Sequence, residues 1–217
     1  MELEYLVKLI KILSEGLKVS LKIFTLTLIF SIPLGIIVSI LGNSKNKIIS
    51  GITKLYILVM RGTPLLLQII CIYFAPYYLF KISYNRFIAV IIAFSINYAA
   101  YFGEIFRGGI QSISKGQWEA AFTLGFSKTK TYFLIILPQA IKRVIPSVSN
   151  EVITLVRDTS LAQVIGITEL FSTAQKQANF KFSIIPLLVC GLIYLLISIV
   201  LTAIFNYSEK KLDYYRG

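Results

Sequence analysis

Long uncharged runs alternate with short polar stretches along most of the chain. The uncharged runs are Ile23–Leu41, Gly62–Phe80, Phe87–Gly103 and Phe182–Ser208. A helix of about 20 apolar residues crosses the hydrocarbon core of a bilayer. Each run therefore predicts one membrane-spanning helix, and flanking residues extend the first two helices to about 17–41 and 50–80.

A fifth apolar segment, residues 141–164, contains charged side chains. Glu151, Arg157 and Asp158 lie within it. Such a segment is unfavourable in lipid but suits a helix that turns polar groups toward a cavity. We therefore predict an all-α integral membrane protein in which residues 1–217 form one domain with five spanning helices.

Five spans place the two ends of the chain on opposite sides of the membrane. Lysine and arginine are more frequent in the loops that face inside if the N-terminus is outside, as the positive-inside rule requires. Residues 1–16 alternate apolar and charged positions at helical spacing and predict a helix lying in the interface. Residues 209–217 are expected to form a cytoplasmic tail.

Composition excludes a soluble or disordered chain. Hydrophobic residues make up 56%, charged residues 15%, and the mean hydropathy is +0.77, whereas a soluble domain has about 25% charged residues. The net charge of +12 then indicates sidedness and partner surfaces, and no nucleic acid is expected. Histidine is absent, and Cys71 and Cys190 lie in apolar runs, so neither a metal site nor a disulfide is expected.

Residues 108–140 form the most informative polar segment. Gly116 and Gly125 separate pieces of helical composition, and Pro138 is expected to stop the second piece. We predict two short amphipathic helices with a bend near Gly125. The run Glu119-Ala120-Ala121 places one acid beside two small residues, which lets another protein approach closely. An interfacial hairpin that only caps the bundle fits the composition equally well.

This loop resembles the EAA loop of ABC-importer permeases. The shared pattern is EAA, Gly125 four positions later, and then Ile135, Leu137 and Pro138. Four further segments resemble the type I subfamily that imports polar amino acids, including arginine, histidine and glutamine permeases: RGTPLLLQ at 61–68, EIFRGGIQSISKGQWEAA at 104–121, LPQAIKR at 137–143 and RDTSL at 157–161. One departure is Arg157, where the family leads us to expect lysine.

The resemblance implies a five-helix permease in a bacterial cell membrane. It implies a second permease subunit (a second copy or a close paralogue), a cytoplasmic ABC ATPase dimer and an extracytoplasmic solute-binding protein. Glu119, Ala120, Ala121 and Gly125 would couple the chain to the ATPase. The sequence has no GxxxxGK[ST] motif. We therefore expect this chain to bind no cofactor and not to be an enzyme; ATP and Mg²⁺ would bind the partner ATPase.

Two acids in the fifth segment suggest the substrate. Glu151 and Asp158 are seven residues apart and share one helix face, which suits a cation. We expect a cationic amino acid, arginine, lysine or histidine, ahead of glutamine, because carboxylates bind a guanidinium bidentately. Thr159 and Ser160 would add hydroxyls. Alternatively, Glu151 pairs with an arginine such as Arg61 or Arg143, and Asp158 caps a helix end.

The third span supplies a second polar stripe. Asn97, Tyr101 and Glu104 share a face and Tyr98 is adjacent. Asn97 is a candidate ligand because its amide can bond either end of an amino acid. Tyr98 and Tyr101 could line the site, although their pattern favours packed aromatics with interhelical hydrogen bonds. Glu104 is expected to pair with Arg107.

The motif Arg61-Gly62-Thr63-Pro64 interrupts the second span. Proline removes a backbone donor, so the motif indicates either a discontinuous helix beside a binding site or a packing kink. Arg61 would contact a substrate carboxylate or balance the acids. An ATP-independent channel or secondary carrier is the alternative function, and the loop pattern argues against it.

Overall fold

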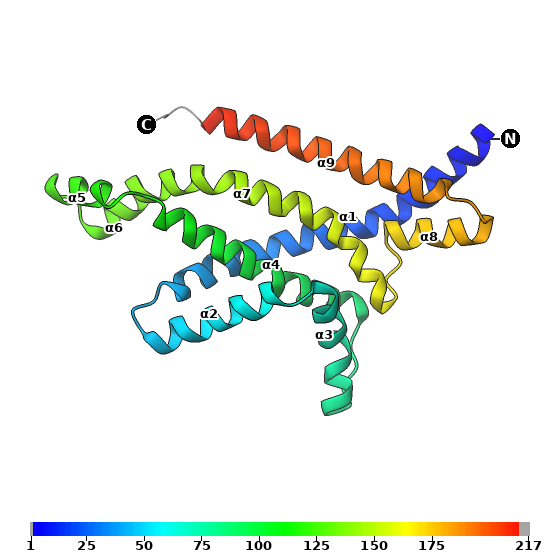
Figure 1. Cartoon of the computed structure of the whole chain (residues 1–217), viewed down its shortest axis with the longest axis horizontal. Coiled ribbons are helices and arrows are strands. Elements are labelled where there is room, and N and C mark those ends of the chain that lie inside the picture. Colours follow the sequence, from blue (N-terminus) through cyan, green and yellow to red (C-terminus); the bar gives the residue numbers. More distant parts are fainter. Residues whose placement is uncertain (1, 213–217) are drawn as a thin grey trace.

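The structure is a computed structural model that describes residues 2–212, and all regular elements in this range are helical. The elements are α1 (Glu2–Gly42), α2 (Lys47–Gly62), α3 (Leu65–Phe80), α4 (Arg86–Gln111), α5 (Lys115–Thr123), α6 (Lys128–Thr131), the π-helix η1 (Tyr132–Ile136), α7 (Leu137–Asp158), the 3-10 helix η2 (Thr159–Ile165), α8 (Leu170–Lys181) and α9 (Ile185–Leu212). The long helices run alongside one another, and α3 projects away from them (Figure 1). The predicted all-helical fold is confirmed.

Three helices of the described range are long and apolar enough to cross a membrane. They are α1, α4 and α9, and the bent pair of α2 and α3 makes a fourth if it counts as one span. α7 does not meet this criterion, and its charged residues include Glu151, Arg157 and Asp158. The five-span count therefore stays a prediction.

α1 is one unbroken helix from Glu2 to Gly42. Its early residues Leu9 and Leu13 are buried in a cluster with Leu170, Ala174 and Cys190 of α8 and α9. α1 continues through residue 16 without a break. The boundary expected there is absent, and a place for the first turns at the membrane surface stays a prediction.

Two glycines let α1 and α4 approach closely. A Cβ on Gly35 would lie 2.7 Å from the Cβ of Phe102, and one on Gly103 would lie 2.5 Å from Cγ1 of Val38. Small residues at such crossings bring helix backbones together, which favours association in lipid. This contact fixes α4, the helix that contributes most to the core.

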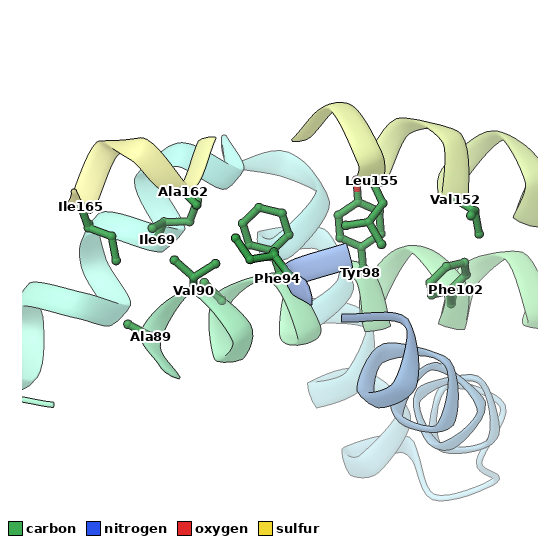
Figure 2. Close-up of a cluster of buried hydrophobic side chains, with 12 residues drawn as sticks. Ile69, Ala89, Val90, Phe94, Tyr98, Phe102, Val152, Leu155, Ala162 and Ile165 are labelled. Atoms are coloured by element: carbon green, nitrogen blue, oxygen red, sulfur yellow. The ribbon is translucent and has the colours of Figure 1, made fainter. Parts of the chain in front are cut away.

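The main apolar core lies between α4 and α7. Phe94, Tyr98 and Phe102 form a row on α4, and Val152 and Leu155 face them from α7 (Figure 2). The same cluster includes Ile69 of α3 and Ala162 and Ile165 of η2. The core therefore joins the helices that bear the predicted polar stripes.

The loop between α4 and α7 contains the short helices α5, α6 and η1 at the end of the bundle where α9 also ends, while α1 begins at the other end (Figure 1). Gly125 has φ +80°, which favours glycine, and this turn separates α5 from α6 as predicted. Pro138 does not stop the second helix, contrary to expectation. It is the second residue of α7, which continues directly from the π-helix η1, so the chain stays helical through it.

Candidate functional site

A cavity of about 550 Å³ lies beside the junction of α2 and α3. Its lining residues are Arg61, Gly62, Thr63, Pro64, Leu65, Asn97, Tyr98, Tyr101, Glu151, Thr154, Asp158 and Leu161. Six of the eight predicted substrate residues line this one cavity. The structure therefore brings the two polar stripes and the Arg61 motif together.

The junction of α2 and α3 is a true helix break. The two helix axes are bent by 109°, and Thr63 and Pro64 between them have extended backbone angles. Of the two interpretations of the Arg61–Pro64 motif, the discontinuous helix is the one that forms. A break of this kind places backbone groups beside a cavity.

Asp158 is held by a buried tyrosine. The Tyr98 hydroxyl donates a hydrogen bond to Oδ2 of Asp158 at 2.8 Å, and Tyr98, which is 2% exposed, stacks on Phe94 with ring centroids 6.4 Å apart. Asp158 makes no side-chain cap to η2, so the helix-capping alternative does not form. Tyr98 thus both packs in the core and orients a cavity carboxylate.

Glu151 is half-buried and makes no hydrogen bond or ion pair within the described residues. Arg61 instead places its guanidinium 5.2 Å from the centroid of the Tyr101 ring, a cation–π contact. Arg143 donates to the carbonyl of Ser112. The expected alternative, in which either arginine pairs with Glu151, is therefore not observed.

Asn97 contacts the helix break with its amide nitrogen. Nδ2 donates to the carbonyl of Met60 at 3.0 Å and to Oε1 of Gln68 at 2.9 Å. The amide oxygen of Asn97 has no hydrogen bond in the described range and remains the group that a ligand could use. The sequence pattern does not single out Gln68 as a functional residue. The missing N–H of Pro64 is the signal that could have found it, because the carbonyl of Met60 then needs another donor.

Thr159 and Ser160 are not brought into the cavity. Thr159 is fully buried and its hydroxyl donates to the carbonyl of Val156 at 2.7 Å, while the Ser160 hydroxyl donates to the carbonyl of Arg157 at 2.8 Å. Because both hydroxyls bond to nearby backbone, the geometry does not support their expected contact with substrate. Thr154, on the same helix stripe as the acids, lines the cavity instead.

A second cavity, of about 460 Å³, shares Arg61 and Gly62 with the first. Lys54, Arg61, Glu104 and Arg107 are among its lining residues. Nε of Arg107 donates to Glu104 at 2.9 Å, and the two side chains form an ion pair, so the predicted pair is confirmed. Glu104 is thereby neutralised, whereas Glu151 and Asp158 of the first cavity form no ion pair within the described residues.

The loop residues predicted to contact an ATPase differ in exposure. Glu119 and Ala120 are exposed on α5, whereas Ala121 is 1% exposed. The carbonyl of Ala121 accepts the N–H of Phe126 at 3.0 Å, which closes the turn at Gly125. The exposed face continues with Phe122 and Leu124, so the loop offers an acid beside apolar side chains.

These features define a class of protein: a polytopic helical membrane protein with a broken helix beside a charged cavity and a helical loop at one end. Residues 31–214 match the family described as the binding-protein-dependent transport system inner membrane component. The chain belongs to this family. It is therefore a permease of the bacterial inner membrane.

Similar proteins agree with this assignment. The chain is 38% identical over 199 residues to the arginine transport system permease protein ArtQ of Bacillus subtilis, covering 91% of both chains. It is 37% identical over 206 residues to the L-cystine permease TcyB of the same organism, covering 94% of this chain and 88% of TcyB. It is 36% identical over 216 residues to a putative glutamine permease, GlnP, of Rickettsia bellii, covering 96% and 98%.

A solved structure gives the same result. The chain superposes with a TM-score of 0.89, at 30% identity and covering 95% of this chain and 97% of the other, on a chain of an amino acid ABC transporter crystallised with histidines. A chain of the MetNI methionine transporter shares the fold, with a TM-score of 0.71 at 12% identity over 98% and 99% of the two chains. The sequence resemblance to amino-acid ABC permeases is confirmed.

Proposed function

We propose that this chain is the transmembrane subunit of an ATP-driven importer of cationic L-amino acids. The observation that supports the substrate class is the set of charges lining the 550 Å³ cavity, which are two acids, Glu151 and Asp158, and one base, Arg61. Arginine, lysine and protonated histidine have two positive groups and one carboxylate. They complement two acids and one base in number and sign.

Other amino acids complement the cavity less well. Glutamine has one ammonium and one carboxylate, so it would leave one acid of the cavity without a partner. Cystine has two of each and would need a second base. An unpaired charge in a poorly hydrated site is unfavourable. Relatives of this chain are named for arginine, cystine and glutamine transport. The side chains that line the cavity are therefore the basis on which we assign the substrate.

In the proposed complex the substrate carboxylate contacts Arg61. Asp158 binds the α-ammonium and Glu151 binds the side-chain cation. The Tyr98 hydroxyl orients Asp158 for this role. The amide oxygen of Asn97 accepts a further hydrogen bond from the ligand. Tyr101, against which Arg61 already rests, closes one side of the cavity.

Transport follows alternating access energised by a partner. The exposed loop face at Glu119, Ala120, Phe122 and Leu124 docks on a cytoplasmic ATPase dimer, which binds ATP and Mg²⁺. The loop end of the bundle is then cytoplasmic and the beginning of α1 lies outside. A second permease subunit, identical or paralogous, and an external solute-binding protein complete the importer, and membrane lipid covers the remaining apolar surface.

Uptake by the reconstituted transporter tests this proposal. Proteoliposomes with internal ATP would be offered labelled arginine, lysine, histidine, glutamine and cystine. We expect ATP-dependent uptake with arginine and lysine ahead of glutamine and cystine. Preference for glutamine or cystine would contradict the cationic assignment. Uptake without ATP or an ATPase would instead indicate a secondary carrier.

A further inference from the structure

Proline at position 64 leaves one carbonyl of α2 without its helical donor. In an α-helix the carbonyl of residue 60 accepts the N–H of residue 64, and proline has no N–H. The carbonyl of Met60 therefore needs another partner. Within a membrane protein an unsatisfied backbone carbonyl is strongly unfavourable.

Two side-chain amides supply the missing donor. Nε2 of Gln68 lies 2.9 Å from the carbonyl oxygen of Met60, and Nδ2 of Asn97 lies 3.0 Å from the same oxygen. Asn97 also donates to Oε1 of Gln68 at 2.9 Å. These bonds connect α2, α3 and α4 at one point, and both amides are buried, with Gln68 8% and Asn97 3% exposed.

Gln68 also binds the residue inside the break. Its Nε2 lies 2.8 Å from the Thr63 hydroxyl and 3.2 Å from the Thr63 carbonyl. Thr63 in turn donates its hydroxyl and its N–H to the carbonyl of Val59, at 2.8 and 3.1 Å. One amide thus holds both the end of α2 and the extended residue that follows it.

We propose that Gln68 is a positioning residue for substrate binding. Together with Asn97 it forms an amide clasp that fixes the α2–α3 break and thereby sets Arg61 and the backbone at 62–65 against the acids of α7. This inference rests on the proposed function of the 550 Å³ cavity. Glutamine is required because the site needs donors toward two carbonyls and an acceptor for Asn97 on one side chain.

The change Gln68→Met tests the clasp because methionine has a similar volume and no amide. Spin labels on cysteines replacing Leu58 and Tyr78, which are exposed on α2 and α3, would report the distance across the break in the complete transporter. Both native cysteines would first be replaced. We expect a narrow distance distribution with Gln68 and a broad one with Gln68→Met.

Thr53→Val is the matched control. Thr53 is buried on α2 and its hydroxyl donates one hydrogen bond to the carbonyl of Ile49 at 2.8 Å, away from the break. This isosteric change removes one hydrogen bond and should leave the distance distribution narrow. Gln68→Glu, which keeps an acceptor for Asn97 but has no donor when ionised, serves if Gln68→Met does not fold, and we expect broadening there too.

Arginine uptake separates positioning from general stability. We expect Gln68→Met to raise the half-saturating arginine concentration about tenfold. A factor of this size corresponds to the free energy of roughly one hydrogen bond, lost because Arg61 is no longer aligned. The maximal rate should change less than twofold. Thr53→Val should change neither. An unchanged distance distribution in Gln68→Met would overturn the clasp. A broadened distribution with unchanged half-saturation would keep the clasp but overturn the cavity as substrate site, and with it the positioning role.

Discussion

Replacing Glu151 by glutamine separates a substrate ligand from a structural acid. Glu151 is half-buried on α7 and has no hydrogen bond or ion pair within the described residues. Glutamine keeps its size and removes its charge. If the acid exists to bind a cation, the change should weaken arginine transport without weakening the fold, because no internal partner is lost.

The size of the effect follows from the cavity. Two unit charges 4 Å apart attract by about 4 kcal/mol at an effective dielectric constant of 20, and the desolvation of both groups offsets part of this. A hydrogen bond to a charged group contributes about 1.5–3 kcal/mol net. We therefore expect Glu151→Gln to raise the half-saturating arginine concentration roughly tenfold to hundredfold.

The assay is uptake by proteoliposomes that contain the complete transporter, with arginine and glutamine measured in parallel. The side chain of the substrate glutamine is neutral and forms no ion pair with Glu151. Glutamine uptake should therefore change less than threefold. Glu15→Gln, which removes an exposed acid paired with Lys18 outside the cavity, is the control and should leave both unchanged. Equal loss of arginine and glutamine uptake, or a lower melting temperature in Glu151→Gln, would refute the reasoning.

Three further substitutions test other parts of the account. Tyr98→Phe removes the hydrogen bond to Asp158 and, at about 1 kcal/mol, should raise half-saturating arginine about fivefold; unchanged uptake would contradict the orienting role. Gly125→Ala places a side chain at φ +80° at a cost of about 1–2 kcal/mol. Arginine-stimulated ATP hydrolysis should fall severalfold, and unchanged hydrolysis would show that the turn is dispensable for coupling. Gly16→Ala puts a Cβ 2.6 Å from Oγ1 of Thr173 and should lower stability by about 1–3 kcal/mol, visible as a lower melting temperature of the purified protein; an unchanged value would show that α8 moves aside.

Much of the site could be predicted from helical periodicity. Glu151 and Asp158 were placed on one face because they are seven residues apart, and both line the cavity with Asn97, Tyr98 and Tyr101. Periodicity predicts which residues of one helix share a face. Their meeting across α4 and α7 depended on the further expectation that polar faces of membrane helices turn toward one cavity.

Local hydrogen bonds explain why Thr159 and Ser160 do not line the cavity as the sequence predicts. The hydroxyls of Thr159 and Ser160 donate to carbonyls three residues earlier, a local choice that composition does not reveal. Gln68 was overlooked because an amide in an apolar run signals nothing until the missing donor at Pro64 is traced to the Met60 carbonyl.

The element boundaries show the same limit. Charged residues at the start of the chain predict an interfacial helix over 1–16, and in the structure these residues belong to α1, which continues to Gly42. Leu9 and Leu13 are buried by α8 and α9, which lie more than 150 positions later. Pro138 was expected to end a helix, yet the chain stays helical through it, because the π-helix η1 passes directly into α7. Long-range packing and exact register were not available from the local pattern.

The most direct test is an experimental structure of the complete transporter at saturating arginine. We predict arginine in the 550 Å³ cavity, with its two cationic groups about 3 Å from carboxylate oxygens of Glu151 and Asp158 and its carboxylate toward Arg61. Arginine bound elsewhere in this chain, or an empty cavity in a preparation that transports arginine, would contradict it.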